Sequence, residues 1–138
     1  MAQADVEVVL KQFRDTNARD FAAVMDAYAD DVELAACGER LGVLAASVSG
    51  KEAVGEWFGD WFRQFGSDYR FDVEEASEVA GRVLLVARHH GRGRDSGVPV
   101  EERWAYAYTV RDGLITGVEI FADRDARATA LKALGAAP

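Results

Sequence analysis

The chain has 138 residues, of which 49% are hydrophobic and 29% are charged, and its formal net charge is −8. This composition predicts one globular domain over residues 1–138, and the acidic charge argues against nucleic acid or an anionic membrane as the main partner. A single cysteine excludes an intramolecular disulfide. No segment has the pattern of a signal peptide or the length of a membrane span, so we expect a cytoplasmic protein.

Apolar residues recur with helical spacing twice near the start of the chain, over residues 6–13 and 21–28. They predict two amphipathic helices, the second with Asp20 as its N-cap. A short strand is expected at residues 32–36, and the mixed composition of residues 38–48 predicts a loop.

A third helix is expected to begin at the capping-box pattern formed by Ser49 and Glu52. Its apolar face is wide and rich in aromatic residues, so this helix must bury a broad stripe against a large, curved surface. The residues on that face are Val54, Trp57, Phe58, Trp61, Phe62 and Phe65.

From Tyr69 onward the hydrophobic period changes to two, which is typical of half-buried strands. The turn-forming pairs Ala80-Gly81 and Asp112-Gly113 separate successive strands. Helices that gather early in the chain and strands that gather late predict an α+β fold, with helices packed on one face of a curved antiparallel sheet. The expected elements are strands at residues 69–74, 82–92, 98–110 and 114–122, and a last helix that is capped by Asp123 and ends near Leu134.

The hairpin region contains two patterns that resemble ligand sites. GRGRDSG, residues 91–97, has glycines spaced as in a phosphate-binding loop, but a strand with Pro99 follows it instead of a helix, so a hairpin is the better interpretation. His89 and His90 are adjacent, and a strand sends neighbours to opposite faces, so they cannot share a metal ion. We expect neither a metal nor a cofactor.

The same hairpin carries a strip of basic residues opposite Glu101 and Glu102. Cross-strand ion pairs at a solvated edge are one interpretation. The alternatives are an anion-binding pocket mouth or a contact between two subunits. The basic residues are Arg82, Arg88, Arg92 and Arg94.

Three stretches together resemble the SnoaL-like branch of the nuclear transport factor 2-like superfamily: DFAAVMDAYADDVEL, SGKEAVGEWF and GRGRDSGVPVEERWAYAYTVRDGLITGVEIFADRDA. The resemblance extends from Asp5 to Leu134. It implies a cone-shaped α+β fold in which an N-terminal helical pair and a curved antiparallel sheet surround a long third helix and a deep pocket, usually in a homodimer. Relatives include isomerases, hydrolases, dehydratases, polyketide cyclases and non-catalytic binding modules, so function must be argued from the pocket.

Strand alternation, matched to the inward positions of the family, predicts which side chains face the pocket. His89 is expected to face in and His90 out, and a bulge near the glycines would reverse this and turn His90 inward beside Arg88. The catalytic candidates are His89 and Tyr106. The expected pocket residues are Phe58, Trp61, Leu85, Ala87, Trp104, Tyr108, Val118 and Ile120, and Glu102 and Ala122 are also expected to face in.

Two known chemistries of the superfamily do not match these positions. Ketosteroid isomerases need an aspartate base, a tyrosine and a protonated aspartate, and the matching residues here are Ala36, Gln12 and Tyr106. Limonene-epoxide hydrolases need an Asp-Arg-Asp set, and Ile120, Ala87 and His89 occupy those positions. Scytalone dehydratase, which uses tyrosines and histidines, is the nearest in chemical type.

Two functional hypotheses remain. In the first, the pocket binds a mainly apolar small molecule with one or two polar groups, and His89 and Tyr106 act on it as acid, base or carbonyl-polarising groups in an isomerase, cyclase, dehydratase or hydrolase. In the second, the chain is a non-catalytic dimerisation or ligand-binding module whose aromatic residues fill its own pocket.

Overall fold

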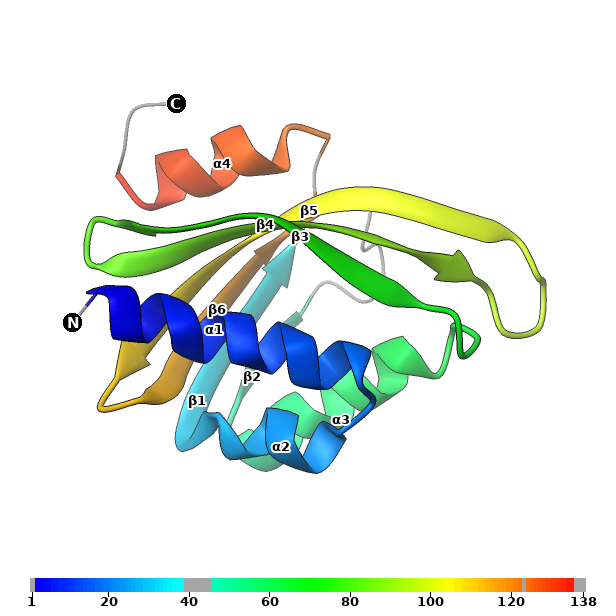
Figure 1. Cartoon of the computed structure of the whole chain (residues 1–138), viewed down its shortest axis with the longest axis horizontal. Helices are drawn as coiled ribbons and strands as arrows, with labels where there is room; N and C mark the ends of the chain where they lie inside the picture. The colour runs from blue at the N-terminus through cyan, green and yellow to red at the C-terminus, as the bar shows by residue number, and fades with distance from the viewer. Residues whose placement is uncertain (1, 39–45, 123, 136–138) are drawn as a thin grey trace.

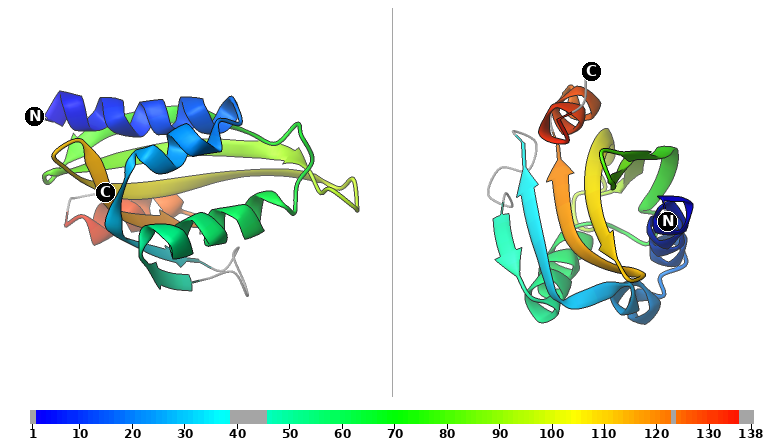
Figure 2. Two further views of the ribbon diagram at one scale, coloured as in Figure 1. Left: turned by 90° about the horizontal axis from the view of Figure 1, so that it is seen from below. Right: turned by 90° about the vertical axis from the view of Figure 1, so that its left-hand side faces the viewer.

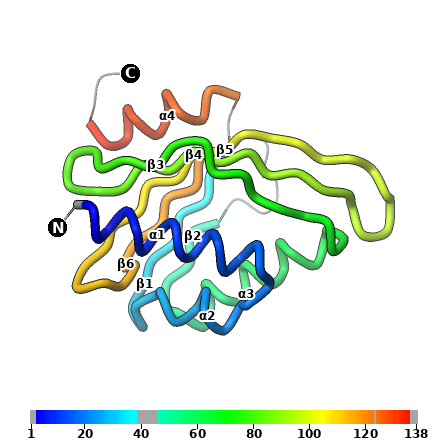
Figure 3. Tube along the Cα trace, in the orientation of Figure 1, coloured from blue at the N-terminus to red at the C-terminus, as the bar shows by residue number. Residues whose placement is uncertain are grey.

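A computed structural model describes residues 2–38, 46–122 and 124–135. No helix of these ranges is long and apolar enough to cross a membrane. Figures 1 and 3 show a strongly curved sheet with helices on both of its faces. In chain order the elements are α1 (Ala2–Asn17), α2 (Phe21–Asp26), β1 (Tyr28–Cys37), β2 (Ala46–Ser49), α3 (Lys51–Phe62), β3 (Arg70–Val79), β4 (Arg82–Arg92), β5 (Pro99–Arg111), β6 (Leu114–Phe121) and α4 (Ala126–Ala133).

The six strands form one sheet in the order β2-β1-β6-β5-β4-β3. Neighbouring strands run antiparallel except for β1 and β6, which are parallel. Helices α1 and α3 lie against the concave face and α4 against the opposite face (Figure 2). The predicted α+β fold with a curved sheet is confirmed. The expectation that the helices pack on one face is wrong for α4, and the sheet departs from the expected antiparallel order at the pair β1–β6.

Polar side chains join the end of α1 to the beginning of β3. The side-chain amide of Asn17 donates to the Phe71 carbonyl at 2.8 Å and accepts from the Phe71 backbone N–H at 2.9 Å. The Arg19 guanidinium donates to the carbonyls of Ser67 and Tyr69 at 3.1 and 2.8 Å. These bonds tie the end of α1 to the beginning of β3. They also give the linked backbone groups the hydrogen-bond partners that buried polar groups need.

Two tight turns and one close approach shape the hairpins. Ala80 and Asp112 have φ values of 53° and precede glycines that also have positive φ, as two-residue hairpin turns require. At Gly91 an added Cβ would lie 2.7 Å from the Tyr69 Cα. Only glycine allows β4 and the start of β3 to approach this closely, which brings Tyr69 beside His89.

The structure corrects the expected boundaries of the first strand. Tyr28 begins β1, where it pairs with Ile115, and does not extend α2. An aromatic residue at helical spacing also suits a strand, and the sheet pairing decides between the two. β1 is therefore longer than the predicted strand at residues 32–36. Part of the predicted loop at residues 38–48 belongs to β2, and residues 39–45 lie outside the described part of the chain.

The expected helix caps are only partly correct. Asp20 caps α2, because its carboxylate accepts from the Ala23 backbone N–H at 3.2 Å. The capping-box prediction at Ser49 is wrong: Gly50 is the N-cap of α3 at a φ of 95°, and no side chain caps it. The N–H of Gly50 donates to the Val32 carbonyl at 2.7 Å, which ties the beginning of this helix to β1. Asp123 lies outside the described residues, and Asp125 is the N-cap of α4.

Alternate residues of β4 and β5 belong to two separate hydrophobic cores. On the concave face, His89 is fully buried next to a cluster that includes Trp104 and Tyr106. On the opposite face, His90 points outward and hydrogen-bonds Asp72 at 3.0 Å. The pairing of β4 with β5 is regular from Val83 to Arg92, so no bulge near the glycines reverses the two histidines. The register shift in the pairing of β3 with β4 lies between Val73 and Glu75. The predicted orientation, His89 in and His90 out, is confirmed.

Candidate functional site

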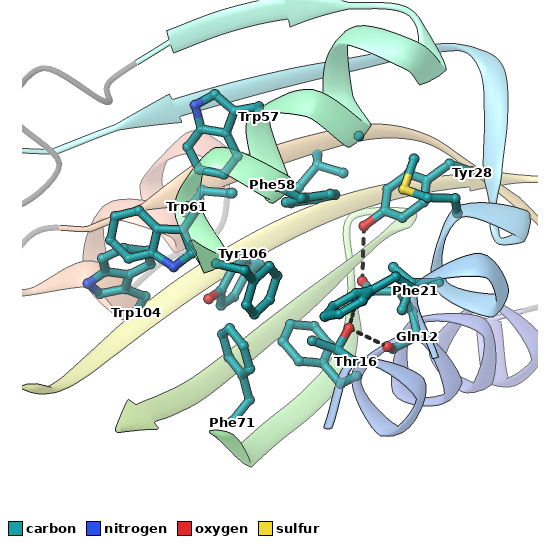
Figure 4. Close-up of a pocket in the computed structure, with 18 of the residues that line it drawn as sticks. Gln12, Thr16, Phe21, Tyr28, Trp57, Phe58, Trp61, Phe71, Trp104 and Tyr106 are labelled. Atoms are coloured by element: carbon teal, nitrogen blue, oxygen red, sulfur yellow. Dashed lines mark hydrogen bonds between the residues drawn. The ribbon is translucent and has the colours of Figure 1, made fainter. Parts of the chain in front are cut away.

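A cavity of about 400 Å³ lies between the concave face of the sheet and helices α1, α2 and α3. Small-molecule sites in proteins measure roughly 300–1,000 Å³. The lining is mainly aromatic and aliphatic, and all three tryptophans of the chain contribute to it. Figure 4 labels Gln12, Thr16, Phe21, Tyr28, Trp57, Phe58, Trp61, Phe71, Trp104 and Tyr106 among the lining residues.

One wall of the cavity is the aromatic face of α3. Fully buried Val54 anchors the helix to the core, and the aromatic residues that follow at helical spacing point the same way. The rings of Trp57 and Trp61 are stacked, with centroids 6.3 Å apart, and the Trp61 ring lies 5.1 Å from that of Trp104 on β5. The wide aromatic stripe predicted for this helix thus faces the cavity.

The end of the cavity next to α1 is a closed polar network. The hydroxyls of Tyr28 and Tyr108 both donate to the Gln12 Oε1, at 3.1 and 3.3 Å. The Gln12 Nε2 donates to the Thr16 Oγ1 at 3.0 Å. Dashed lines in Figure 4 mark hydrogen bonds of this network. Burial raises the pKa of both tyrosines well above the usual value, so they remain neutral donors.

Tyr106 differs from these two tyrosines. Its ring lines the cavity, yet its hydroxyl makes no hydrogen bond within the described ranges of the chain. Burial raises its pKa above the usual value, so the hydroxyl is neutral. Tyr106 therefore offers a hydrogen-bonding group that the fold itself does not use (Figure 4).

His89 is the end of a short hydrogen-bonded chain behind the aromatic wall. The Trp61 Nε1 donates to the Tyr69 hydroxyl at 2.9 Å, and that hydroxyl lies 2.8 Å from the His89 Nδ1. Because an indole can only donate, the Tyr69 oxygen accepts from Trp61 and shares a second hydrogen bond with the His89 Nδ1.

Burial, and secondly the charge of neighbouring His90, lowers the pKa of His89 to about 4. His89 is therefore neutral at physiological pH. Its Nε2 and the Nε1 of Trp104 are both buried, and neither has a hydrogen-bond partner in the part of the chain that the structure describes. The two rings are neighbours, with centroids 4.3 Å apart.

Most residues expected to form the pocket do line the cavity: Phe58, Trp61, Trp104, Tyr106, Tyr108, Val118 and Ile120. Leu85, Ala87 and His89 do not, which corrects the expectation of direct ligand contact for these three. They face the concave side but are fully buried, because the larger aromatic side chains of β5 extend further toward the centre.

The two catalytic candidates do not lie side by side. In the pairing of β4 with β5, His89 is opposite Glu102, whereas Tyr106 is opposite Leu85. Four residues along a strand correspond to about 13 Å, and Trp104 occupies the inward position between them. A direct acid–base pair of His89 and Tyr106 would need a ligand that reaches both groups across Trp104.

Sequence reasoning missed several polar residues of the site. Thr16 was not expected to line it, and Gln12 was considered only as the match to an active-site tyrosine of ketosteroid isomerases. Tyr28 and Tyr69 were expected only as parts of secondary structure. The signal for the first two was available: positions 9, 12, 13 and 16 share one helix face, so two polar residues continue the buried stripe of α1.

The arginines of the basic strip differ in their contacts with carboxylates. Arg88 donates to Glu101 at 2.5 Å and to Asp72 at 2.8 Å, and Arg82 donates to Glu119 at 2.5 Å. Cross-strand pairing is thus confirmed for Arg88. Arg94 instead lines the cavity together with Arg63. The described ranges hold no group of three or more side chains suited to a metal ion.

The model of the SnoaL-like domain matches residues 9–118. A comparison with curated proteins finds no match. Among solved structures, a protein of Jannaschia sp. CCS1 provisionally named a SnoaL-like polyketide cyclase is 21% identical, with a TM-score of 0.76 and a match that covers 100% of this chain and 96% of that chain.

Two further similar structures contain small molecules. TerC, co-crystallised with polyporic acid, is 21% identical with a TM-score of 0.75, and the match covers 95% of this chain and 97% of that chain. The Mycobacterium tuberculosis protein Rv0760c, in complex with estradiol-17β-hemisuccinate, is 23% identical with a TM-score of 0.73, and 91% of this chain matches 98% of that chain. These similarities show a shared fold, and with the match over residues 9–118 the chain belongs to the SnoaL-like domain family.

Proposed function

We propose that this protein binds a mainly apolar small molecule with fused or linked rings and at least one oxygen. The cavity carries this proposal, because about 400 Å³ of space remains after the surrounding aromatic residues have packed. Its aromatic lining suits a ligand with rings, and the Tyr106 hydroxyl is available to an oxygen of that ligand.

The open cavity counts against the second hypothesis, in which the aromatic residues fill the pocket. A cavity of this size holds many water molecules, and an apolar lining gains free energy when a ligand displaces them. The ligands named with the similar structures, polyporic acid and estradiol-17β-hemisuccinate, are ring compounds with oxygen substituents and support this ligand class.

Binding is better supported than catalysis by a His89–Tyr106 pair. His89 is neutral, its Nδ1 is already hydrogen-bonded to the Tyr69 hydroxyl, and it does not line the cavity. Its role in the proposal is to position Trp61 and Tyr69 behind the aromatic wall. A reaction that uses both His89 and Tyr106 is the alternative function. We further propose that the protein is a homodimer, and sedimentation velocity tests this by measuring the mass of the particle in solution.

The test is a cavity-filling substitution on α3. Gly55 lines the cavity, and a Cβ added there would touch only the flexible end of Met25 at 3.4 Å, so Gly55→Leu fills the cavity from a helical position that tolerates a side chain. Ring compounds such as estradiol-17β-hemisuccinate are titrated while the fluorescence of the tryptophans in the lining is recorded.

We expect the wild-type protein to bind and Gly55→Leu to lose at least about tenfold in affinity, since the space for the ligand is gone. Glu56→Leu is the matched control, because it adds the same side chain to an exposed position of the same helix. Equal affinities in both variants, or no saturable binding by a panel of ring compounds, would contradict the proposal.

A further inference from the structure

The rim of the cavity is positively charged although the protein is acidic. The net charge of the chain is −8, yet no aspartate or glutamate is among the described residues that line the cavity. The only charged lining residues there are Arg63 and Arg94, and both are exposed, so they lie where the cavity meets solvent. The charge of the lining is therefore opposite to that of the whole molecule.

Arg94 is held at this rim by the residues that directly follow α3. Its backbone N–H donates to the Gln64 carbonyl at 2.8 Å, and its side-chain Nε donates to the Phe65 carbonyl at 3.3 Å. Its two terminal amino groups form no hydrogen bond or ion pair in the part of the chain that the structure describes. The fold thus anchors the guanidinium by one nitrogen and leaves the other two for a partner.

Arg63 adds a second guanidinium at the C-terminal end of the same helix. It pairs with Asp60, one turn earlier, which is exposed and does not line the cavity. One exposed carboxylate for two guanidinium groups leaves a net positive charge at the rim. An anion bound there gains charge-assisted hydrogen bonds, whereas a cation is repelled.

We propose that the natural ligand is an anionic amphiphile, whose apolar rings occupy the cavity and whose carboxylate is bound at the rim by Arg94, with Arg63 as the second cation. This inference rests on the proposed binding function and adds the charge of the ligand. Of the three interpretations of the basic strip, this inference favours an anion-binding pocket mouth.

The experiment compares matched acids and neutral derivatives. Estradiol-17β-hemisuccinate is titrated against its methyl ester, and anthracene carboxylate against anthracene carboxamide, by tryptophan fluorescence at low and at high salt. We expect each acid to bind about tenfold more tightly than its neutral derivative at low salt, with a smaller preference at high salt.

Arg94→Gln is expected to remove most of this preference by weakening only the acid, and the double variant with Arg63→Gln is expected to remove all of it. Arg92→Gln is the matched control, because Arg92 is exposed on the same hairpin but does not line the cavity. It should change neither affinity by more than about twofold.

Equal binding of acid and neutral derivative by the wild-type protein, or a preference that survives in the double variant, would overturn this inference. If Gly55→Leu still blocks both compounds in that case, the proposed binding function stands and only the charge assignment fails. If neither member of either pair binds the wild-type protein, both proposals fail together.

Discussion

The two faces of β4 and β5 are built from alternate residues of the same strands but pack in different ways. On the face toward α4, Leu84, Ala105 and Ala107 are fully buried against the helix in a mainly aliphatic core that also includes Phe121. On the concave face, Trp104 and Tyr106 extend far from the sheet and surround a cavity. Small residues allow a helix to lie close, whereas large rings hold the helices apart and leave space between them.

The face toward α4 is thus closed by packing, whereas the concave face is open toward the cavity. The closed face contributes stability, because each buried side chain contacts neighbours on all sides. The open face gives up part of that packing where side chains border the cavity, and it thereby keeps a binding site.

The largest effect is expected from truncation on the closed face. Leu84→Ala should lower the free energy of unfolding by about 3 kcal/mol, because it leaves a new void under α4. Ile120→Ala, on the cavity lining, should cost about 1 kcal/mol less, since part of its surface already borders empty space. Urea denaturation measures both. Only Ile120→Ala should alter ligand affinity, and a ligand-binding defect in Leu84→Ala without unfolding would contradict the division between the faces.

The next effect concerns His89, the buried histidine of the concave face. Its pKa is lowered from 6.5 to about 4 by burial, so the unfolded chain takes up a proton at a higher pH than the folded protein. The stability that it contributes is present above pH 6.5 and is lost as the pH falls toward 4, by about 3 kcal/mol in full.

Nuclear magnetic resonance titration measures this pKa directly, because the chain has only two histidines and His90→Asn identifies the His89 signal. In urea denaturation between pH 6.5 and 5, His89→Phe should show a smaller loss of stability than the wild-type protein. A His89 signal that titrates near pH 6.5 would mean that the aromatic wall admits water and would remove the basis for its positioning role.

The smallest effect on stability is expected from the tyrosine hydroxyls that face the cavity. Tyr106→Phe should change the free energy of unfolding by less than about 0.5 kcal/mol, because the Tyr106 hydroxyl makes no hydrogen bond to the described residues. Affinity for an oxygen-bearing ligand should fall about fivefold. Tyr108→Phe is the matched comparison and should cost about 1 kcal/mol, since its hydroxyl donates to Gln12. The reverse order of stabilities would show that Tyr106 belongs to the structural network.

Much of the fold could be predicted from patterns within single segments. The hydrophobic period of two located β3 to β6, and the Asp112-Gly113 pair located a hairpin turn, because both depend on local backbone geometry. The boundaries of β1 and β2 could not be predicted in this way. Tyr28 suits either a helix or a strand, and its pairing with Ile115, far along the chain, decides the outcome.

The candidate site was predictable to a similar degree. Strand alternation indicated that Trp104, Tyr106 and Tyr108 face inward, and all three line the cavity. It could not indicate which inward residues reach the cavity, because that depends on side-chain size and on helices packed from elsewhere. Ala87 and His89 face inward but lie behind larger neighbours.

Periodicity and motifs along the chain were enough to predict the fold class and the family, and they favoured His89 over His90 as the inward residue. Only the tertiary structure decided that His89 is a buried, neutral partner of Tyr69, and that Arg94 stands at the mouth of an apolar cavity. Hydrogen bonds, burial and cavity shape arise where segments distant in the chain meet, and no pattern within one segment contains that information.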